Sequence, residues 1–134
     1  MVIDTSAIFA AIANERDGES YRSAIKRAPL KLISAVTLLE TRIVLHSRLG
    51  QEALQTFEKI VERAGIVVVP FNAQASQAAF DAFRRFGKGQ GGPGQLNIVD
   101  CAAYALARSR NLPLLFKGGD FAATDVRPVL ISEQ

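Results

Sequence analysis

The sequence has 134 residues, of which 49% are hydrophobic and 22% charged, as in a folded domain and unlike a disordered chain. The longest uncharged apolar stretch near the start, residues 32–39, is too short to cross a bilayer, which argues against a membrane protein. The net charge of +3 favours a polyanion such as nucleic acid as ligand, although solubility alone can explain a charge of this size.

Strand-like and helix-like segments alternate along the chain. In chain order we expect a strand at 1–4, helices at 6–13 and 19–28, a strand at 30–34, helices at 35–49 and 51–64, a strand at 66–69, a helix at 72–85, a glycine-rich loop at 87–94, a helix at 97–110, and strands at 113–116 and 129–131. The β-branched run at 66–69 is typical of a buried parallel strand. The pattern predicts an α/β fold: a single three-layer domain over residues 1–134, with a mainly parallel, roughly five-stranded sheet flanked by helices.

Four acidic residues fall where this fold would bring them to one edge of the sheet: Asp4, Glu40, Asp100 and Asp120. Asp4 and Asp120 follow strand-like runs, and ligands of open parallel sheets bind beyond the carboxyl ends of the strands. Carboxylates gathered there repel one another, by roughly 4 kcal/mol for a pair about 4 Å apart at an effective dielectric of about 20. They must take up protons or hold a divalent cation, so metal-dependent chemistry is the leading hypothesis.

Each of these acids also has a purely structural explanation. Short polar side chains cap helix N-termini and stabilise turns, and a polar residue three positions before an acid can form a capping box with it. The corresponding positions are a cap at Asp4, boxes at Thr37–Glu40 and Asn97–Asp100, and a turn at Asp120.

Glu40 argues against explaining all four acids in this way. It is expected on the same helix face as Val36, Ile43 and Val44, where an unpaired charge is costly. Ser34 is also a better start for this helix, which would place Glu40 in its interior.

Other catalytic patterns fail. The glycine-rich loop at 87–94 follows a helix and lacks a Gly-Lys-Ser/Thr ending, which excludes a P-loop. A Ser-His-Asp triad would need His46, the only histidine, which lies in mid-helix. One histidine and one cysteine exclude a conventional zinc site. Several basic residues could line a phosphate path, with solvated helix faces as the alternative: Arg42, Arg48, Arg84, Arg85, Lys88 and Lys117.

The one cysteine, Cys101, has no partner in the chain for a disulfide, which suits a reducing compartment. Its apolar neighbours indicate a small buried side chain and not a nucleophile. Strand-like sequence begins at Met1 and leaves no room for a charged leader with an apolar segment. We therefore expect a cytoplasmic protein.

Five segments together carry a family resemblance. They are residues 2–7, 34–40, 87–89, 96–107 and 115–125. In this order and at this spacing they resemble the PIN-domain family, with the closest likeness to VapC-type toxins of bacterial toxin–antitoxin pairs. Two departures are Ile98–Val99, where the family usually has an aromatic residue and glycine, and the missing histidine-proline in the glycine loop. Neither departure changes a carboxylate.

The resemblance implies a metal-dependent endoribonuclease that hydrolyses RNA phosphodiester bonds as the toxin of a type II pair, is inhibited by a small antitoxin and commonly forms a homodimer. The acids Asp4, Glu40, Asp100 and Asp120 would be catalytic and would hold one or two Mg²⁺ or Mn²⁺ ions. Residues expected to orient them are Thr5, Ser6, Asn97 and Thr124. Candidate RNA-binding residues are Arg42, Lys88 and Lys117. Asp125 is a reserve acid or a surface residue.

Two other functions remain open at this point. An RNA-processing nuclease of the same fold, without a toxic role, would share every motif. A non-catalytic, receiver-like module that accepts a phosphoryl group could also place acids at strand ends, although Lys117 alone supports it.

Helices 19–28 and 35–64 carry many apolar and basic residues, including Leu38, Leu45, Leu49, Leu54 and Ile60. We expect part of this surface to form a groove or a dimer face. A short amphipathic antitoxin segment could bind such a groove as a helix and bring an arginine or lysine to the acids. The alternative is that these residues form the core of a monomer.

Overall fold

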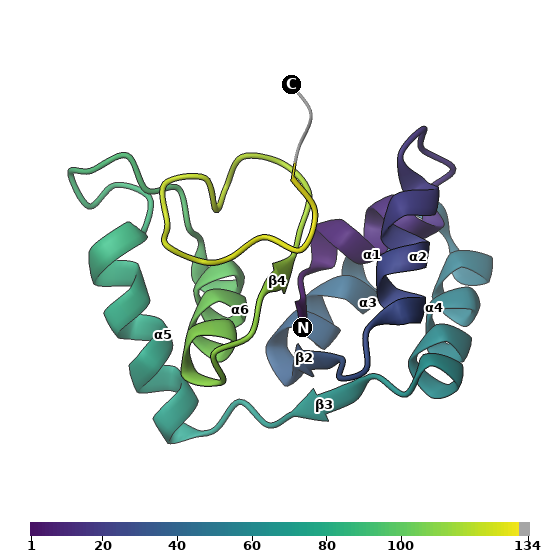
Figure 1. Ribbon diagram of the computed structural model, residues 1–134, viewed down its shortest axis with the longest axis horizontal. Helices are drawn as coiled ribbons and strands as arrows, with labels where there is room; N and C mark the ends of the chain where they lie inside the picture. Colours follow the sequence, from purple (N-terminus) through teal and green to yellow (C-terminus); the bar gives the residue numbers. More distant parts are fainter. Residues whose placement is uncertain (132–134) are drawn as a thin grey trace.

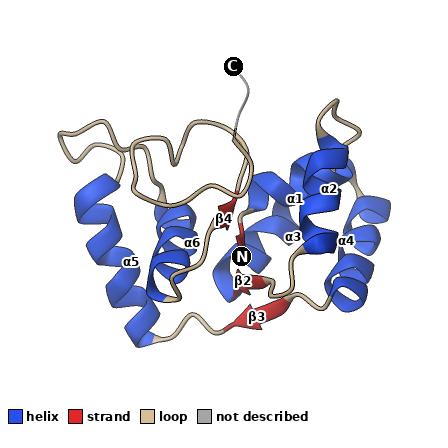
Figure 2. Ribbon diagram, viewed as in Figure 1, coloured by secondary structure: helices blue, strands red, loops and turns tan. Residues whose placement is uncertain are grey.

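The computed structural model describes residues 1–131, and in this range a four-stranded parallel sheet of order β3-β2-β1-β4 lies between helices (Figure 1, Figure 2). The strands are β1 (Val2–Ile3), β2 (Leu32–Ser34), β3 (Val67–Val69) and β4 (Leu114–Leu115). The helices are α1 (Thr5–Ile12), α2 (Gly18–Arg27), α3 (Ala35–Leu49), α4 (Gln51–Ala64), α5 (Ala73–Phe86) and α6 (Ile98–Ser109).

Strands β1, β2 and β4 bury both of their faces, which makes the fold three-layered as predicted. Successive residues of a strand point to opposite faces of the sheet. Ile3, Ile33 and Leu115 join a core with α1 to α4, whereas Val2 and Leu114 join a second core with α5 and α6. Figure 1 shows α5 and α6 on one side of the sheet and α1, α2 and α4 on the other.

Local sequence signals set several helix ends. The side chains of Asn72 and Asn97 accept hydrogen bonds from the amides of Ala75 and Asp100, and so cap α5 and α6. Gly65 ends α4 with a φ of 68°, a left-handed conformation that glycine adopts without steric cost.

The expected fifth strand at 129–131 is wrong. Pro128 forms only an isolated parallel bridge with Leu114, to whose carbonyl the amide of Val129 donates a hydrogen bond of 3.0 Å. Proline has no amide hydrogen with which to continue a ladder, so pairing ends there.

The expectation of a buried strand at 66–69 is also wrong. β3 is an edge strand that pairs with β2 on one side, and Val67 and Val68 are 51% and 38% exposed. A β-branched run indicates a strand but does not fix its place in the sheet.

The apolar face of α3 is narrower than predicted. Its buried residues are Thr37, Leu38, Thr41 and Leu45, whereas Ile43 is 55% exposed. Glu40 is half-buried and does not share a buried face with Ile43. Within residues 1–131, no helix combines the length and the apolar character needed to span a membrane.

Candidate functional site

The four predicted acids line one open cavity of about 380 Å³, to which α1, α3, α6 and the loop after β4 contribute. Asp4 directly follows β1, and Asp120 lies in the loop that follows β4. Asp100 opens α6, and Glu40 lies in the first half of α3. The chain thus brings together four carboxylates that are distant in sequence.

Asp4 is both a helix cap and a buried acid of the cavity. Its Oδ2 atom accepts hydrogen bonds from the Ser6 amide at 3.1 Å and from the Ser6 hydroxyl at 2.6 Å. Its Oδ1 atom is buried and has no hydrogen-bond partner within residues 1–131. A buried acceptor in this state costs about 1–3 kcal/mol, and a cation would satisfy it. Burial raises the pKa of Asp4, and the nearby charge of Glu40 adds to this effect against the hydrogen bonds from Ser6.

Asp100 likewise combines a structural and a chemical role. It forms a full capping box, in which its amide donates to Asn97 Oδ1 at 2.8 Å and its Oδ2 accepts from the Asn97 amide at 3.0 Å. Burial raises the pKa of Asp100 to about 7, and the charges of Asp4, Asp120 and Glu40 contribute in the same direction. The structural explanation is therefore correct for Asp4 and Asp100, and it does not exclude a role in the cavity. The box expected at Thr37–Glu40 is wrong, because α3 begins at Ala35 and Thr37 lies inside the helix.

These oxygen donors fit a hard divalent cation. The unpartnered Oδ1 of Asp4 and the raised pKa of Asp100 both mark negative charge that lacks a positive partner. Among the described residues, no three or more acidic, cysteine or histidine side chains lie in an arrangement that could together hold a metal ion. Mg²⁺ keeps several of its waters and is commonly held by one or two carboxylates, so an open arrangement suits it.

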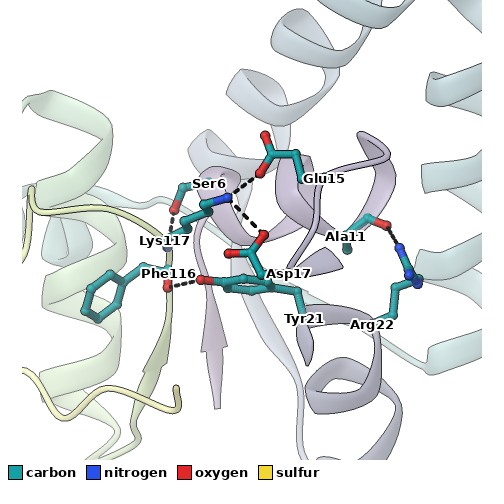
Figure 3. A network of polar contacts seen from close by, with 8 residues as sticks. All are labelled: Ser6, Ala11, Glu15, Asp17, Tyr21, Arg22, Phe116 and Lys117. Atoms are coloured by element: carbon teal, nitrogen blue, oxygen red, sulfur yellow. Dashed lines mark hydrogen bonds and ion pairs between the residues drawn. The ribbon is translucent and has the colours of Figure 1, made fainter. Parts of the chain in front are cut away.

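Ser6 connects Asp4, at the end of β1, to the segment that follows β4. The Ser6 hydroxyl donates to Asp4. It also accepts a 2.9 Å hydrogen bond from the backbone amide of Lys117, two residues after β4 (Figure 3). This arrangement restricts the Asp4 carboxylate to one orientation.

The other residues expected to orient the acids lie in different surroundings. Asn97 contacts Asp100 through the capping box and lines the cavity. The Thr5 hydroxyl lies 3.0 Å from that of Thr41, which joins α1 to α3, the helix that carries Glu40. Thr124 stabilises its own turn by donating to the carbonyl of Phe121 and does not line the cavity.

The basic candidates differ in their positions. Lys117 lines the cavity, and its ammonium group is ion-paired with Glu15 and Asp17 of the α1–α2 loop (Figure 3). Arg42 lies outside the cavity wall and pairs with Glu58 at 2.8 Å. Lys88 is exposed in the glycine loop, also outside the wall.

Sequence reasoning missed Phe9 as a cavity residue. The guanidinium carbon of Arg48, which also lines the cavity, lies 4.5 Å from the centroid of the Phe9 ring. The sequence carried a signal for Arg48 but none for Phe9. Glu40, Val44 and Arg48 are four residues apart, which places them on one helix face.

Asp125, the reserve acid, lies outside the cavity and is held by other side chains. The Tyr104 hydroxyl donates a hydrogen bond to it, and Arg85 and Arg108 pair with it at 3.6 and 3.8 Å. The hydrogen bond from Tyr104 and these two cations lower the pKa of Asp125.

Comparison with known proteins identifies the family of this chain. The family model described as "PIN domain" matches residues 1–127, so the chain belongs to the PIN-domain family, as its sequence resemblance predicted. It is 39% identical to "Ribonuclease VapC28" of Mycobacterium tuberculosis over 97% of this chain and 98% of that protein. It is 42% identical to "Ribonuclease VapC" of Mycolicibacterium smegmatis over 96% of this chain and 99% of that protein.

Solved structures agree on the fold. The chain superposes with a TM-score of 0.76 on VapC20 of Mycobacterium tuberculosis, described as a sarcin-ricin loop cleaving toxin, at 20% identity over 93% of this chain and 95% of that one. It superposes with a TM-score of 0.69 on a toxin–antitoxin complex from Klebsiella pneumoniae, at 15% identity over 92% of both chains.

Proposed function

We propose that this chain is an endoribonuclease that hydrolyses phosphodiester bonds of RNA and acts as the toxin of a type II toxin–antitoxin pair. Membership of the PIN-domain family and the near-full-length similarity to proteins named ribonuclease VapC support this function. The structural observation that carries it is the cavity in which Asp4, Asp100 and two further acids converge, although none of the four forms an ion pair among the described residues.

The proposed cofactor is Mg²⁺ or Mn²⁺, as one or two ions. All candidate ligands are carboxylate oxygens, which suit these hard cations. Asp4 and Asp100 would hold the ion, with Glu40 and Asp120 completing the site from α3 and from the loop after β4. When bound, the metal would supply an activated water and neutralise charge that develops on the phosphoryl group.

The chain's own residues prepare the site in two ways. Ser6 and the Asn97 capping box hold the two buried carboxylates in fixed orientations before substrate binds. The acids also repel one another, and this repulsion favours the uptake of a cation between them.

The proposed partner is a small antitoxin protein, bound in the apolar groove between α1, α2 and α4. The groove has a volume of about 480 Å³ and a floor that includes Ala11, Ile25, Ile60 and Ala64. Its rim is basic: Arg22, Lys26, Lys31, Lys59 and Arg63. An amphipathic helix with apolar residues on one face and acids beside them would fit both features.

The apolar residues predicted for this surface are divided between core and surface. Ile60 lines the groove, whereas Leu38 and Leu45 are buried in the core beneath it. Leu54 is half-buried, and Leu49 is 39% exposed. The groove therefore depends on fewer apolar residues than expected, with α1 and α2 supplying the rest.

A homodimer is the proposed assembly. Leu39 and Ile43 on α3 are 56% and 55% exposed, and Val67 and Val68 on the edge strand β3 are also exposed. An exposed edge strand with apolar side chains is a liability that a second copy would cover. The cytoplasm is the proposed location, supported by the single buried cysteine.

Two experiments test the proposed function. Purified protein mixed with single-stranded RNA should cleave it with Mg²⁺ or Mn²⁺, lose the activity in EDTA and regain it when the metal is restored. The toxin role is tested by expression with and without the neighbouring small reading frame. Growth arrest that the neighbour relieves is expected, whereas harmless expression of an active nuclease would favour the RNA-processing alternative.

A further inference from the structure

The cavity has two chemically different ends. One end holds the acids Asp4, Asp100 and Asp120 together with Glu40. From Glu40, α3 extends along the wall through Val44 to Arg48, eight residues on, which corresponds to about 12 Å of helix. Phe9 of α1 lies beside Arg48, so this second end consists of a cation and an aromatic ring.

Arg48 and Lys117 are the basic residues that line the cavity, and only Arg48 has no acidic partner among the described residues. Among the ion pairs of the described residues, Lys117 takes part in two and Arg42 in one, and none involves Arg48. Its guanidinium is instead placed over the Phe9 ring, with the carbon 4.5 Å from the ring centroid. The Arg48 side chain is exposed, whereas Phe9 is half-buried and packs against the core of α1 to α4.

We propose that Arg48, supported from behind by Phe9, is a stacking platform for a nucleobase of the RNA next to the cleaved bond. This inference rests on the ribonuclease function proposed above and identifies where that site binds its substrate away from the acids. A planar guanidinium that has one face on an aromatic ring can accept a base on its other face. Such stacking tolerates any base and positions a single strand without reading its sequence.

The position of Arg48 suits a substrate whose phosphates are repelled by the acids of the cavity. RNA phosphates are negative, and the acid end of the cavity repels them until a metal is bound. A stacking contact about 12 Å along α3 attracts the base face and adds a positive charge without neutralising the acids. The platform would thus hold the strand so that its neighbouring phosphodiester lies over the carboxylates.

Arg48→Lys separates stacking from charge, because lysine keeps the positive charge but lacks the plane. The matched control is Arg42→Lys, the same exchange on the same helix, at an arginine that pairs with Glu58 outside the cavity. Phe9→Leu removes the supporting ring, and its thermal unfolding is measured in parallel because Phe9 also contacts the core.

The measurement is fluorescence anisotropy in EDTA, so that no cleavage occurs, with two probes. One is a short single-stranded oligoadenylate, and the other is a ribose-phosphate strand of the same length without bases. Arg48→Lys should weaken binding of the oligoadenylate about 5- to 30-fold, as expected for loss of one stacked base, and that of the base-free strand by less than about twofold. Arg42→Lys should leave both affinities within about twofold of the unmodified chain.

The outcomes are distinct. An equal loss for both strands would mean that Arg48 binds phosphate and not a base, and unchanged binding of both would mean that it binds neither; each result overturns the platform. Failure of the unmodified chain to bind oligoadenylate, together with no cleavage in Mg²⁺ or Mn²⁺, would instead overturn the ribonuclease function itself. If the unmodified chain cleaves RNA and Arg48→Lys binds both strands as tightly as the unmodified chain does, only the platform is rejected.

Discussion

Two aspartates next to α6 have opposite electrostatic surroundings. Asp100 opens the helix, and burial together with three other acids raises its pKa to about 7. Asp125 lies in the loop after β4 and contacts the second half of α6, where the Tyr104 hydroxyl and Arg108, together with Arg85 of α5, lower its pKa. The chain therefore supplies positive partners for the Asp125 carboxylate and leaves the Asp100 carboxylate among like charges. This difference supports the proposal that Asp100 and its neighbours bind an external cation, whereas Asp125 stabilises the fold.

The largest effect should come from neutralising the acids of the cavity. Asp4→Asn and Asp100→Asn should each abolish metal-dependent RNA cleavage. This loss is larger than the about 10- to 100-fold loss of activity that is typical when a residue that only orients a metal ligand is changed. An amide offers a neutral oxygen where the cation needs charge. Cleavage of labelled RNA in Mg²⁺ and in Mn²⁺ measures this loss.

Asp125→Asn is the matched control, because it makes the same exchange at the ion-paired aspartate. It should keep cleavage within about threefold, since exposed ion pairs contribute little. If Asp4→Asn or Asp100→Asn cleaved RNA as well as Asp125→Asn does, the assigned centre would be wrong.

Ser6→Ala should give the next largest effect. The change removes the hydroxyl that links Asp4 to the Lys117 amide and leaves the carboxylate free to rotate. We expect Mn²⁺ affinity to fall about 10- to 100-fold, as for other outer-shell partners. Calorimetric titration measures it, and Thr124→Ala, a hydroxyl outside the cavity, should leave the affinity unchanged.

The stability of the metal-free protein should depend on pH through Asp100. Because its pKa is raised in the folded state, from 3.8 to about 7, the fold favours the protonated carboxyl. The resulting stabilisation is complete below about pH 4 and is lost as the pH rises through about 7. Asp100→Asn should therefore be more stable than the unmodified chain at pH 8, by about 1–3 kcal/mol, and this gain should disappear near pH 4.

Thermal unfolding in EDTA across this pH range tests that prediction. Asp125→Asn should show the opposite sign, because a lowered pKa stabilises the fold above about pH 4 and the variant loses that contribution. A stability difference between Asp100→Asn and the unmodified chain that did not change with pH would contradict the like-charge environment of Asp100.

The smallest effect concerns the ion pairs of Lys117 with Glu15 and Asp17. They are partly exposed, and such pairs contribute up to about 1 kcal/mol. Glu15→Gln should lower the free energy of unfolding by less than about 1 kcal/mol, measured by urea denaturation at low salt. A loss of several kcal/mol would mean that the α1–α2 loop is a structural support of the site.

The convergence of the acids could be predicted because it follows from topology. Carboxyl ends of parallel strands meet at one edge, so Asp4 and Asp120 could be placed near each other from the strand pattern alone. The capping box at Asn97–Asp100 could also be predicted from the sequence, since it depends only on residues three positions apart.

Features that depend on packing between distant elements could not be predicted. The contact of Phe9 with Arg48 requires that α1 and α3 lie side by side, which neither segment encodes by itself. The edge position of β3 depends on strand order, and the exposure of Ile43 depends on what covers α3. Nothing in the sequence indicated that Arg42 would form an ion pair with Glu58 on the next helix.

The central claim is that the acids of the cavity, and not the ion-paired Asp125, bind a divalent cation. Its most direct test is calorimetric titration of Mn²⁺ into the metal-free chain, Asp4→Asn and Asp125→Asn at one pH near 8. Saturable binding to the unmodified chain and to Asp125→Asn, with loss of binding in Asp4→Asn, is the predicted result. Equal binding by Asp4→Asn and the unmodified chain, or loss of binding in Asp125→Asn alone, would contradict it.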